Sequence, residues 1–341
     1  MNHIERVKET LAHRQPDQCP AFLGRIDDLE HWCRAFGVKD EEELRLLLKL
    51  DIRKVYYHGT FRKEKGKNIW GASDVFGSYG SDRGSYPLAH AETVADIENY
   101  AWPSPDILDM EFYGNRVKGM NPRFPLLLSL GDLFLINTLM DMIGMEDSLI
   151  LMMNEPKVIE AAIAHIESFI LETMKRVMDA HAPKAFAFWF ADDFSTQRGM
   201  MISPDLWRKF LKPTYKKIFE LIKSYNLLVW FHSCGAFRPV MQDLVDIGMD
   251  IWETVQAHLD GNDPEGLKRE FGSNLTFFGA INCQKTLPFG TPEDVRKEVR
   301  ERVRILGKNG GYICGPDHSI QANMPVENIV ALFDEIQKCS V

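Results

Sequence analysis

The sequence is poor in cysteine, in excess positive charge and in long apolar runs, and each shortage excludes a class of protein. Six cysteines in 341 residues are too few for a disulfide framework, so we expect reduced thiols in a cytoplasmic protein. No run of about 18 apolar residues is present, which argues against a membrane-spanning helix. The net charge of −9 argues against broad electrostatic capture of nucleic acid or of an anionic membrane.

Several familiar motifs are missing as well. The sequence has no glycine-rich phosphate loop of Walker or Rossmann type and no Gly-x-Ser-x-Gly. Residues 1–20 lack the apolar core of a signal peptide. What remains is ordinary globular composition, 45% hydrophobic and 26% charged, in a length that suits one large α/β barrel or two modest domains.

Short apolar runs of β type alternate with longer helical patterns. Several of these runs are apolar nearly throughout, as expected for parallel strands that are buried on both faces. The eight predicted strands are 19–23, 52–57, 125–130, 185–190, 227–232, 250–255, 275–281 and 310–314. This alternation predicts a (β/α)8 TIM barrel as a single domain over residues 1–341, with a doubly wound open sheet as the alternative.

Helix signals fill the segments between the strands. An apolar stripe predicts a helix over 158–177, and both Ser203-Pro204 and Thr291-Pro292 predict an N-cap followed by a helical first-turn proline. We also expect an N-terminal helical extension over about residues 2–13 and a last helix over 326–336.

The stretch 58–124 is too long for one crossover and is predicted to be an excursion after the second strand. We expect a helix near 92–100 within it and a lid over the barrel mouth. Its aromatic residues Trp70, Phe76 and Tyr86 either line a pocket or pack the lid.

The sharpest chemical signal is His232-Ser233-Cys234, at the end of a predicted strand. Side chains alternate along a strand, so His232 and Cys234 point to the same side and can bind one metal ion. Cys314 ends the last predicted strand, and the carboxyl ends of barrel strands meet at one mouth. We therefore predict a zinc site of these three residues, with Glu253 as a fourth ligand or near neighbour. The alternative is that both cysteines are small buried apolar residues and that His232 is a hydrogen-bonded core histidine.

Other polar candidates also follow predicted strands. One of Asp192 and Asp193 is expected to orient a substrate or transfer a proton, although aspartates also cap turns and helices. His318 is predicted to orient a ligand, donate a proton or contact substrate, with an exposed loop histidine as the alternative. Arg25 suits an anionic substrate group unless it forms a surface ion pair. Gln197, in the same loop as the aspartates, is a further substrate-binding candidate.

These residues lie in segments that resemble the uroporphyrinogen decarboxylase superfamily over essentially the whole chain. The segments are ERVKETLAHRQPDQCPAFL, DDFSTQRGMMISPDLWRKFLKPTYKKI, FHSCGAFRPVMQDLVDIGMDIWETVQ, LKREFGSNLTFFGAINCQKTLPFGTPEDV and CGPDHSIQANMPVENI. The resemblance implies a (β/α)8 barrel whose active cleft lies at the carboxyl ends of the strands.

Two branches of that family imply different chemistry. The decarboxylases use no metal and carry an arginine-rich segment after the first strand, of which only Gly24-Arg25 remains here. His318 resembles the family's histidine near the last strand, although its Gly-His-Gly setting has become Asp-His-Ser. The corrinoid-dependent methyltransferases carry a zinc motif that this chain matches at His232, Cys234 and Cys314.

The second branch implies a zinc-dependent methyltransferase. Such an enzyme moves a methyl group between a corrinoid on a partner protein and a small acceptor, most often a thiol, with Asp192 or Asp193 and His318 orienting the substrate. Because dimers are common in the family, a homodimer is also expected. The alternatives are a decarboxylase of a tetrapyrrole or other polycarboxylate and a non-catalytic corrinoid- or tetrapyrrole-binding protein.

Overall fold

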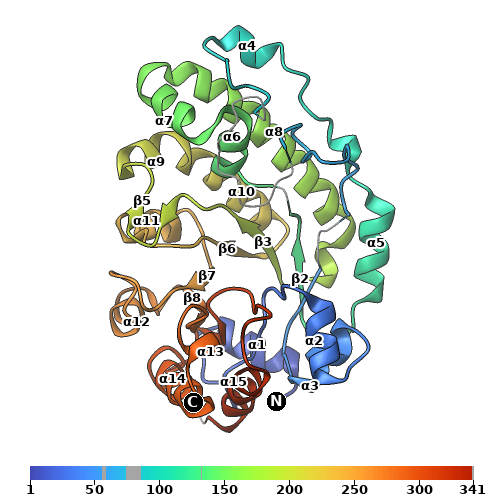
Figure 1. The fold of residues 1–341 in the computed structure, drawn as a ribbon, viewed down its shortest axis with the longest axis vertical. Coiled ribbons are helices and arrows are strands. Elements are labelled where there is room, and N and C mark those ends of the chain that lie inside the picture. The colour runs from blue at the N-terminus through green and yellow to red at the C-terminus, as the bar shows by residue number, and fades with distance from the viewer. Residues whose placement is uncertain (56–58, 74–85, 132, 340–341) are drawn as a thin grey trace.

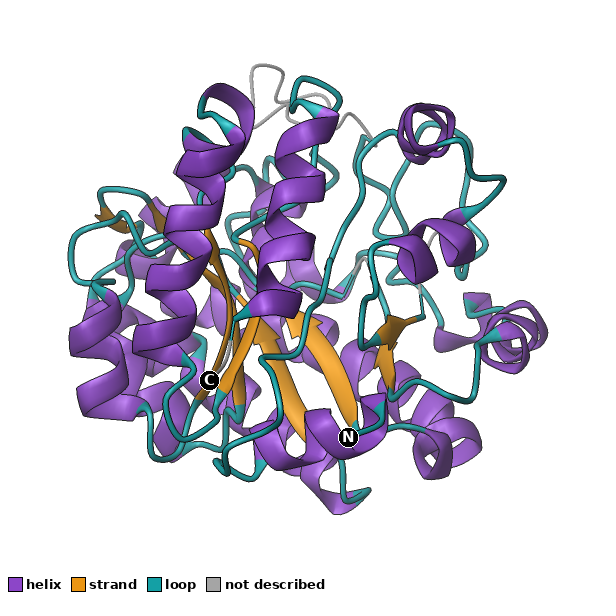
Figure 2. Ribbon diagram, turned by 90° about the horizontal axis from the view of Figure 1, so that it is seen from below, coloured by secondary structure: helices purple, strands orange, loops and turns teal. Residues whose placement is uncertain are grey.

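The structure is a computed structural model that describes residues 1–341 apart from 56–58, 74–85, 132 and 340–341. Its centre is a curled parallel sheet of seven strands, and helices surround the sheet (Figures 1 and 2). In sheet order the strands are β1 (Arg53–Lys54), β2 (Leu126–Ser129), β3 (Ala187–Ala191), β6 (Leu228–His232), β7 (Ile251–Val255), β8 (Thr276–Ile281) and β9 (Tyr312–Pro316). All neighbours in this sheet pair in parallel, as the alternating pattern predicts.

The predicted first strand, 19–23, is present only as a single bridge. Ala21 pairs in parallel with Cys314 of β9, and the Phe22 N–H donates to the carbonyl of Cys314 at 3.0 Å. On its other side, the carbonyl of Ala21 accepts from the N–H of Asp51 at 2.8 Å. This segment therefore lies between β9 and the residues that lead into β1.

The other predicted strands are found as strands, and their observed ends differ from the predicted ends by a few residues. The second, 52–57, is confirmed at Arg53–Lys54, and its last two residues lie outside the described part of the chain. A separate antiparallel hairpin, β4 (Ser195–Thr196) and β5 (Gly199–Met200), follows β3 and was not predicted.

The described helices surround the sheet, and most of them lie between successive strands along the chain. They are α1 (His3–Leu11), α2 (Leu29–Phe36), α3 (Glu41–Leu47), α4 (Val94–Glu98), α5 (Met110–Gly119), α6 (Ile136–Ile143), α7 (Met145–Asn154), α8 (Pro156–His181), α9 (Pro204–Phe210), α10 (Lys212–Ser224), α11 (Arg238–Asp246), α12 (Pro264–Phe271), α13 (Thr286–Phe289), α14 (Pro292–Leu306) and α15 (Val326–Lys338). Among the described residues, no helix combines the length and the apolar character that a membrane crossing requires.

Helix starts follow the predicted cap chemistry. Ser203 and Thr291 are the N-caps of α9 and α14, and the side chain of each accepts a hydrogen bond from a first-turn N–H. The predicted helix near 92–100 is α4, and its N-cap Thr93 forms a capping box with Asp96.

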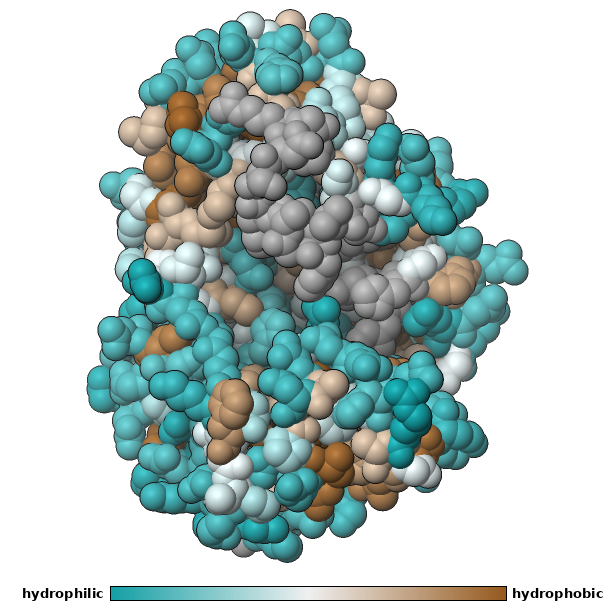
Figure 3. All heavy atoms as spheres, in the orientation of Figure 1, coloured by the Kyte–Doolittle hydropathy of each residue, from teal (hydrophilic) through white to brown (hydrophobic). Residues whose placement is uncertain are grey.

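The aromatic residues of the excursion are mostly packing residues. Trp70 is buried, and its ring lies 4.8 Å from that of Phe169 in α8. The ring of Tyr86 lies against Gly144, while Phe76 lies outside the described residues. Apolar side chains also gather on the surface over α7, towards the upper left of Figure 3, where Ile150 and Met153 are 48% and 66% exposed.

Alternate side chains of the strands fill two separate apolar cores. One core lies inside the curl of the sheet and includes Trp189, Trp230, Phe278 and Ile313. The other lies between the sheet and the helices and includes Cys314. Neighbouring strand residues point to opposite faces, which places Ile313 and Cys314 in different cores.

Candidate metal centre

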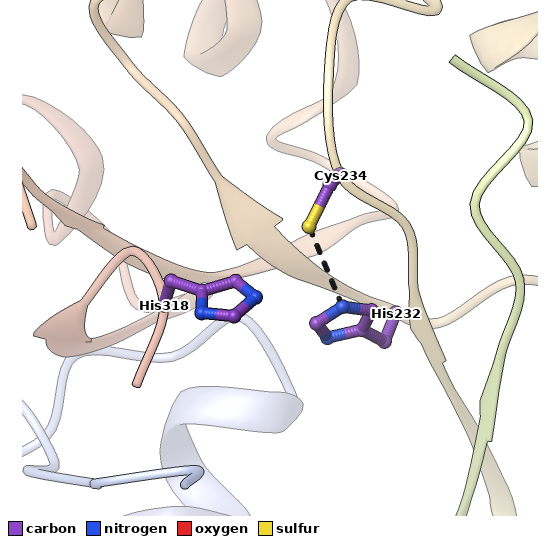
Figure 4. Close-up of side chains that lie close together, drawn as sticks. All are labelled: His232, Cys234 and His318. Carbon is purple, nitrogen blue, oxygen red and sulfur yellow. Dashed lines mark hydrogen bonds between the residues drawn. The ribbon is translucent and has the colours of Figure 1, made fainter. Parts of the chain in front are cut away.

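Three potential metal ligands meet at the carboxyl end of the sheet. His232 is the last residue of β6, Cys234 lies two residues beyond it, and His318 lies two residues beyond β9. One ligand atom of each lies within 4.8 Å of the others, and this is the one group of three or more His, Cys, Asp and Glu side chains so placed in the described part of the chain. Figure 4 shows the three side chains pointing toward one another.

The spacing of the first two ligands fits a shared zinc ion. The Cys234 Sγ lies 3.5 Å from the His232 Nε2. Sulfur at about 2.3 Å and nitrogen at about 2.0 Å from a tetrahedral zinc ion are about 3.5 Å apart. The residues present therefore fit Zn²⁺ with one position left for a substrate.

A buried carboxylate orients His232. Glu253 of β7 is 4% exposed, and its Oε1 lies 3.0 Å from the His232 Nδ1. Its Oε2 accepts from the indole N–H groups of Trp189, at 3.1 Å, and Trp230. A carboxylate can only accept from Nδ1–H, so in the neutral, metal-binding form of His232 the lone pair is on Nε2, the atom that faces Cys234.

A buried lysine lies close to that carboxylate. The Lys54 Nζ sits 3.5 Å from the centre of the Trp189 ring, and burial, partly offset by Glu253, lowers the pKa of Lys54 to about 8. Burial disfavours the Glu253 carboxylate, but the charge of Lys54 and the hydrogen bond from His232 outweigh it and lower the pKa of Glu253. The carboxylate is therefore ionised at neutral pH and available to His232.

The imidazoles and the thiol shift one another's ionisation. Burial opposes the charged form of His232, but Cys234 and Glu253 outweigh it and raise the pKa of His232 well above its usual value. Burial and a neighbouring carboxylate oppose ionisation of the thiol, yet the two histidines prevail and lower the pKa of Cys234. A thiol whose pKa is lowered by histidines is disposed to bind a metal.

Backbone hydrogen bonds fix the loop that carries Cys234. Its N–H donates to the Asp193 Oδ1 at 2.7 Å, and its carbonyl accepts from the Ser195 hydroxyl at 2.5 Å. Gly235 follows at φ 94°, and a Cβ there would lie 2.5 Å from the Ser195 Oγ and 2.6 Å from the Thr196 carbonyl oxygen. Only glycine fits this position without moving the loop.

The two aspartates take different places. Asp193 contacts the Cys234 loop, whereas Asp192 is fully buried and accepts from the Ile136 N–H at 2.8 Å and the Tyr215 hydroxyl at 2.6 Å. Asp192 therefore caps the start of α6, and burial raises the pKa of Asp192 to about 7. Of the pair, Asp193 is the one next to the candidate ligands.

The structure does not bring Cys314 to the cluster, which corrects the predicted ligand set. Cys314 lies within β9 on the face that points to the helices, packed in the outer core with Cys19 and Tyr312. It is fully buried, and burial raises the pKa of the Cys314 thiol to about 12. His318 takes the third position. The sequence feature that could have identified His318 as a ligand is its position two residues beyond a strand end, which Cys234 shares.

The remaining predicted site residues take different places. Glu253 is a near neighbour that contacts His232, as described above. Arg25 pairs with Asp27 at 2.9 Å, which matches the alternative of an ion pair. Gln197 lies exposed in the turn between β4 and β5.

Comparison with known proteins gives a family and a fold. A family model described as uroporphyrinogen decarboxylase (URO-D) matches residues 88–339. A methylated-thiol–coenzyme M methyltransferase of Methanosarcina mazei is 23% identical over 133 residues, and a uroporphyrinogen decarboxylase of Coxiella burnetii is 22% identical over 149 residues. These alignments cover 38% and 42% of this chain and only 32% and 39% of the relatives.

A solved structure extends the fold comparison to nearly the whole chain. A methyltransferase from Methanosarcina mazei superposes with a TM-score of 0.74 at 16% identity, covering 99% of each chain. At this identity the likeness establishes the shared fold.

Proposed function

The chain belongs to the uroporphyrinogen decarboxylase (URO-D) family, and we propose that it is a zinc-dependent methyltransferase. It would move a methyl group between a corrinoid carried by a partner protein and a small thiol acceptor. The observation that carries this proposal is the cluster of His232, Cys234 and His318, whose ligand atoms lie within 4.8 Å of one another.

We further propose that the curled sheet and segment 20–22 together form a (β/α)8 barrel and that residues 1–341 are one domain. The hydrogen bonds of Ala21 and Phe22 to both flanking segments support closure of the barrel. The cluster then lies at the carboxyl ends of the strands, where barrel enzymes bind their substrates.

The ligand set suits a thiol acceptor. Zinc bound there would deprotonate a coordinated thiol at neutral pH and hold it as a thiolate. One protein thiolate and two neutral imidazoles leave one net positive charge on the divalent ion, which a substrate thiolate neutralises. In this arrangement Glu253 keeps the His232 Nε2 lone pair directed at the ion, and Asp193 holds the backbone of Cys234 in place.

Metal analysis combined with a methyl-transfer assay tests the proposal. We expect one zinc ion per chain and thiol-dependent demethylation of methylcobalamin, both lost in His318→Ala. Cys339→Ser, which changes a cysteine outside the cluster, is the matched control and should keep both. A metal-free protein that leaves methylcobalamin unchanged would contradict the proposal.

A porphyrinogen decarboxylase is the second candidate, supported by the relative that is 22% identical. Recognition of several substrate carboxylates calls for several cationic groups, and Arg25 is already paired with Asp27. Incubation with uroporphyrinogen separates the candidates, because decarboxylated products would favour this second function over methyl transfer.

A further inference from the structure

A chain of hydrogen bonds connects His318 to the loop that follows segment 20–22. The His318 Nδ1 lies 3.1 Å from the Ser319 Oγ, and the Ser319 hydroxyl donates to the Asp27 Oδ2 at 2.8 Å. The other oxygen of Asp27 accepts from the Arg25 Nε at 2.9 Å. Ser319 is 2% exposed, so its hydroxyl exchanges these partners for water only if the loop moves.

The direction of these bonds fixes the tautomer of His318. A hydroxyl has one hydrogen, and Ser319 gives it to the carboxylate of Asp27. Ser319 can then only accept from His318, which requires the hydrogen of the neutral ring to be on Nδ1. The lone pair is left on Nε2, the ring nitrogen on the side of His232 in Figure 4.

The two candidate histidine ligands therefore have matching support. For His232 the acceptor is a carboxylate in direct contact, Glu253, whereas for His318 it is a hydroxyl backed by the carboxylate of Asp27. His232 ends a strand and its side chain is 14% exposed, but His318 lies exposed in a loop. A loop residue has more conformational freedom to lose, so His318 depends more on its hydrogen bonds. We call the hydrogen bonds from His318 through Ser319 to Asp27 the tether.

The backbone holds the tether in register. The Asp27 N–H donates to the carbonyl of Ile320 at 3.0 Å, and Ile26 and Ile320 form a parallel bridge. The loop that carries Asp27 and the loop that carries His318 are thus also joined through the backbone of Ile320, next to Ser319.

We propose that Asp27 and Ser319 are positioning residues for the third metal ligand. They hold His318 in the Nδ1–H tautomer with Nε2 directed at the ion, and neither touches the ion itself. This inference rests on the proposed function, because it concerns the ligands of the same metal.

Zinc affinity and imidazole tautomers test the proposal together. Affinity is measured by competition with a chromophoric chelator, and the tautomer by ¹⁵N spectra of the histidine rings. We expect Asp27→Ala and Ser319→Ala to bind zinc about 10- to 100-fold more weakly and to lose the single Nδ1–H tautomer of His318. Ser319→Thr keeps the hydroxyl and should retain wild-type affinity.

Glu30→Ala is the matched control for the loss of one negative charge. Glu30 lies in the first turn of α2, its side chain is 83% exposed, and it pairs with Arg34. Its removal should leave zinc affinity unchanged within about twofold, since exposed charges are screened by salt. Asp27 is itself about one-third exposed, so Asp27→Ala is expected to fold even if Ser319→Ala does not.

The outcomes separate the inference from the function on which it rests. Wild-type protein that binds one zinc ion while both alanine variants bind equally well would overturn the tether and leave the metal site standing. Wild-type protein that binds no zinc would overturn both. An equal loss of affinity in Glu30→Ala would show a general charge effect and would also overturn the tether.

Discussion

Two cysteines near the ends of strands of the curled sheet, Cys234 and Cys314, have opposite surroundings. Cys234 lies beyond β6 beside two histidines, which lower its pKa, whereas Cys314 lies inside β9 on the helix-facing side, where burial raises its pKa to about 12. Their positions in the sequence looked equivalent. The face of the strand, more than nearness to its end, decides whether a side chain belongs to the site or to the core.

The largest expected contrast between the two cysteines is in thiol reactivity. In zinc-free protein at pH 7.5, Cys234 should react with iodoacetamide more than about 1000-fold faster than Cys314, because the thiolate is the nucleophile. The rate for Cys234 should rise with pH and reach its plateau at a lower pH than the rate for Cys314, because the histidines lower the pKa of Cys234 and burial raises the pKa of Cys314 to about 12. Peptide mapping by mass spectrometry distinguishes the two cysteines. Equal labelling of both in folded protein would contradict the difference in their surroundings.

Serine substitutions sharpen the same contrast at the metal. Cys234→Ser should lower zinc affinity by about 100-fold or more and abolish methyl transfer, because a soft thiolate ligand is lost. Cys314→Ser should keep one zinc ion and lose about 1–3 kcal/mol of unfolding free energy, because a hydroxyl is buried in an apolar core. Elemental analysis and thermal unfolding measure the two effects. Loss of zinc from Cys314→Ser would restore Cys314 to the ligand set.

The same comparison can be made for residues that hydrogen-bond to the ligands, such as Glu253, which contacts His232. Glu253→Gln keeps the size of the side chain but replaces a carboxylate by an amide, which should weaken zinc binding about 10- to 100-fold. Glu298→Gln is the control: this carboxyl is also largely buried, at 12% exposure, but it contacts the Asn282 N–H and not the cluster. Equal zinc affinity in the two variants would contradict the role of Glu253.

The last contrast concerns Asp192, whose burial resembles that of Cys314. Its folded-state pKa of about 7 exceeds the unfolded value of 3.8, so the unfolded chain binds fewer protons between these values. The contribution of Asp192 to stability should therefore fall as pH rises from about 4 to about 7, by no more than about 4 kcal/mol. Asp192→Asn should remove this part of the pH dependence in denaturant titrations, with zinc affinity unchanged.

Much of the fold follows from local sequence patterns. The parallel strands are nearly continuous apolar runs, and proline with a preceding Ser203 or Thr291 marks the helix starts. The first strand was predicted too long, because its pairing reduces to Ala21 and depends on contacts with distant segments. No local pattern encodes such contacts.

The candidate site was only partly predictable. The spacing of His232 and Cys234 was sufficient to predict that the two side chains lie together, because both lie at one strand end. Cys314 was misassigned because apolar residues occupy both faces of β9, so hydrophobicity could not show which face is inside. The hydrogen bonds from Asp27 through Ser319 to His318 join residues about 290 positions apart, so only the folded structure reveals them.

X-ray absorption spectroscopy at the zinc edge tests the central claim most directly. Zinc-loaded protein should show one sulfur at about 2.3 Å and at least two nitrogens at about 2.0 Å, with the outer-shell scattering of two imidazoles. Two sulfurs with one imidazole, or no stoichiometric zinc at all, would contradict a centre formed by His232, Cys234 and His318.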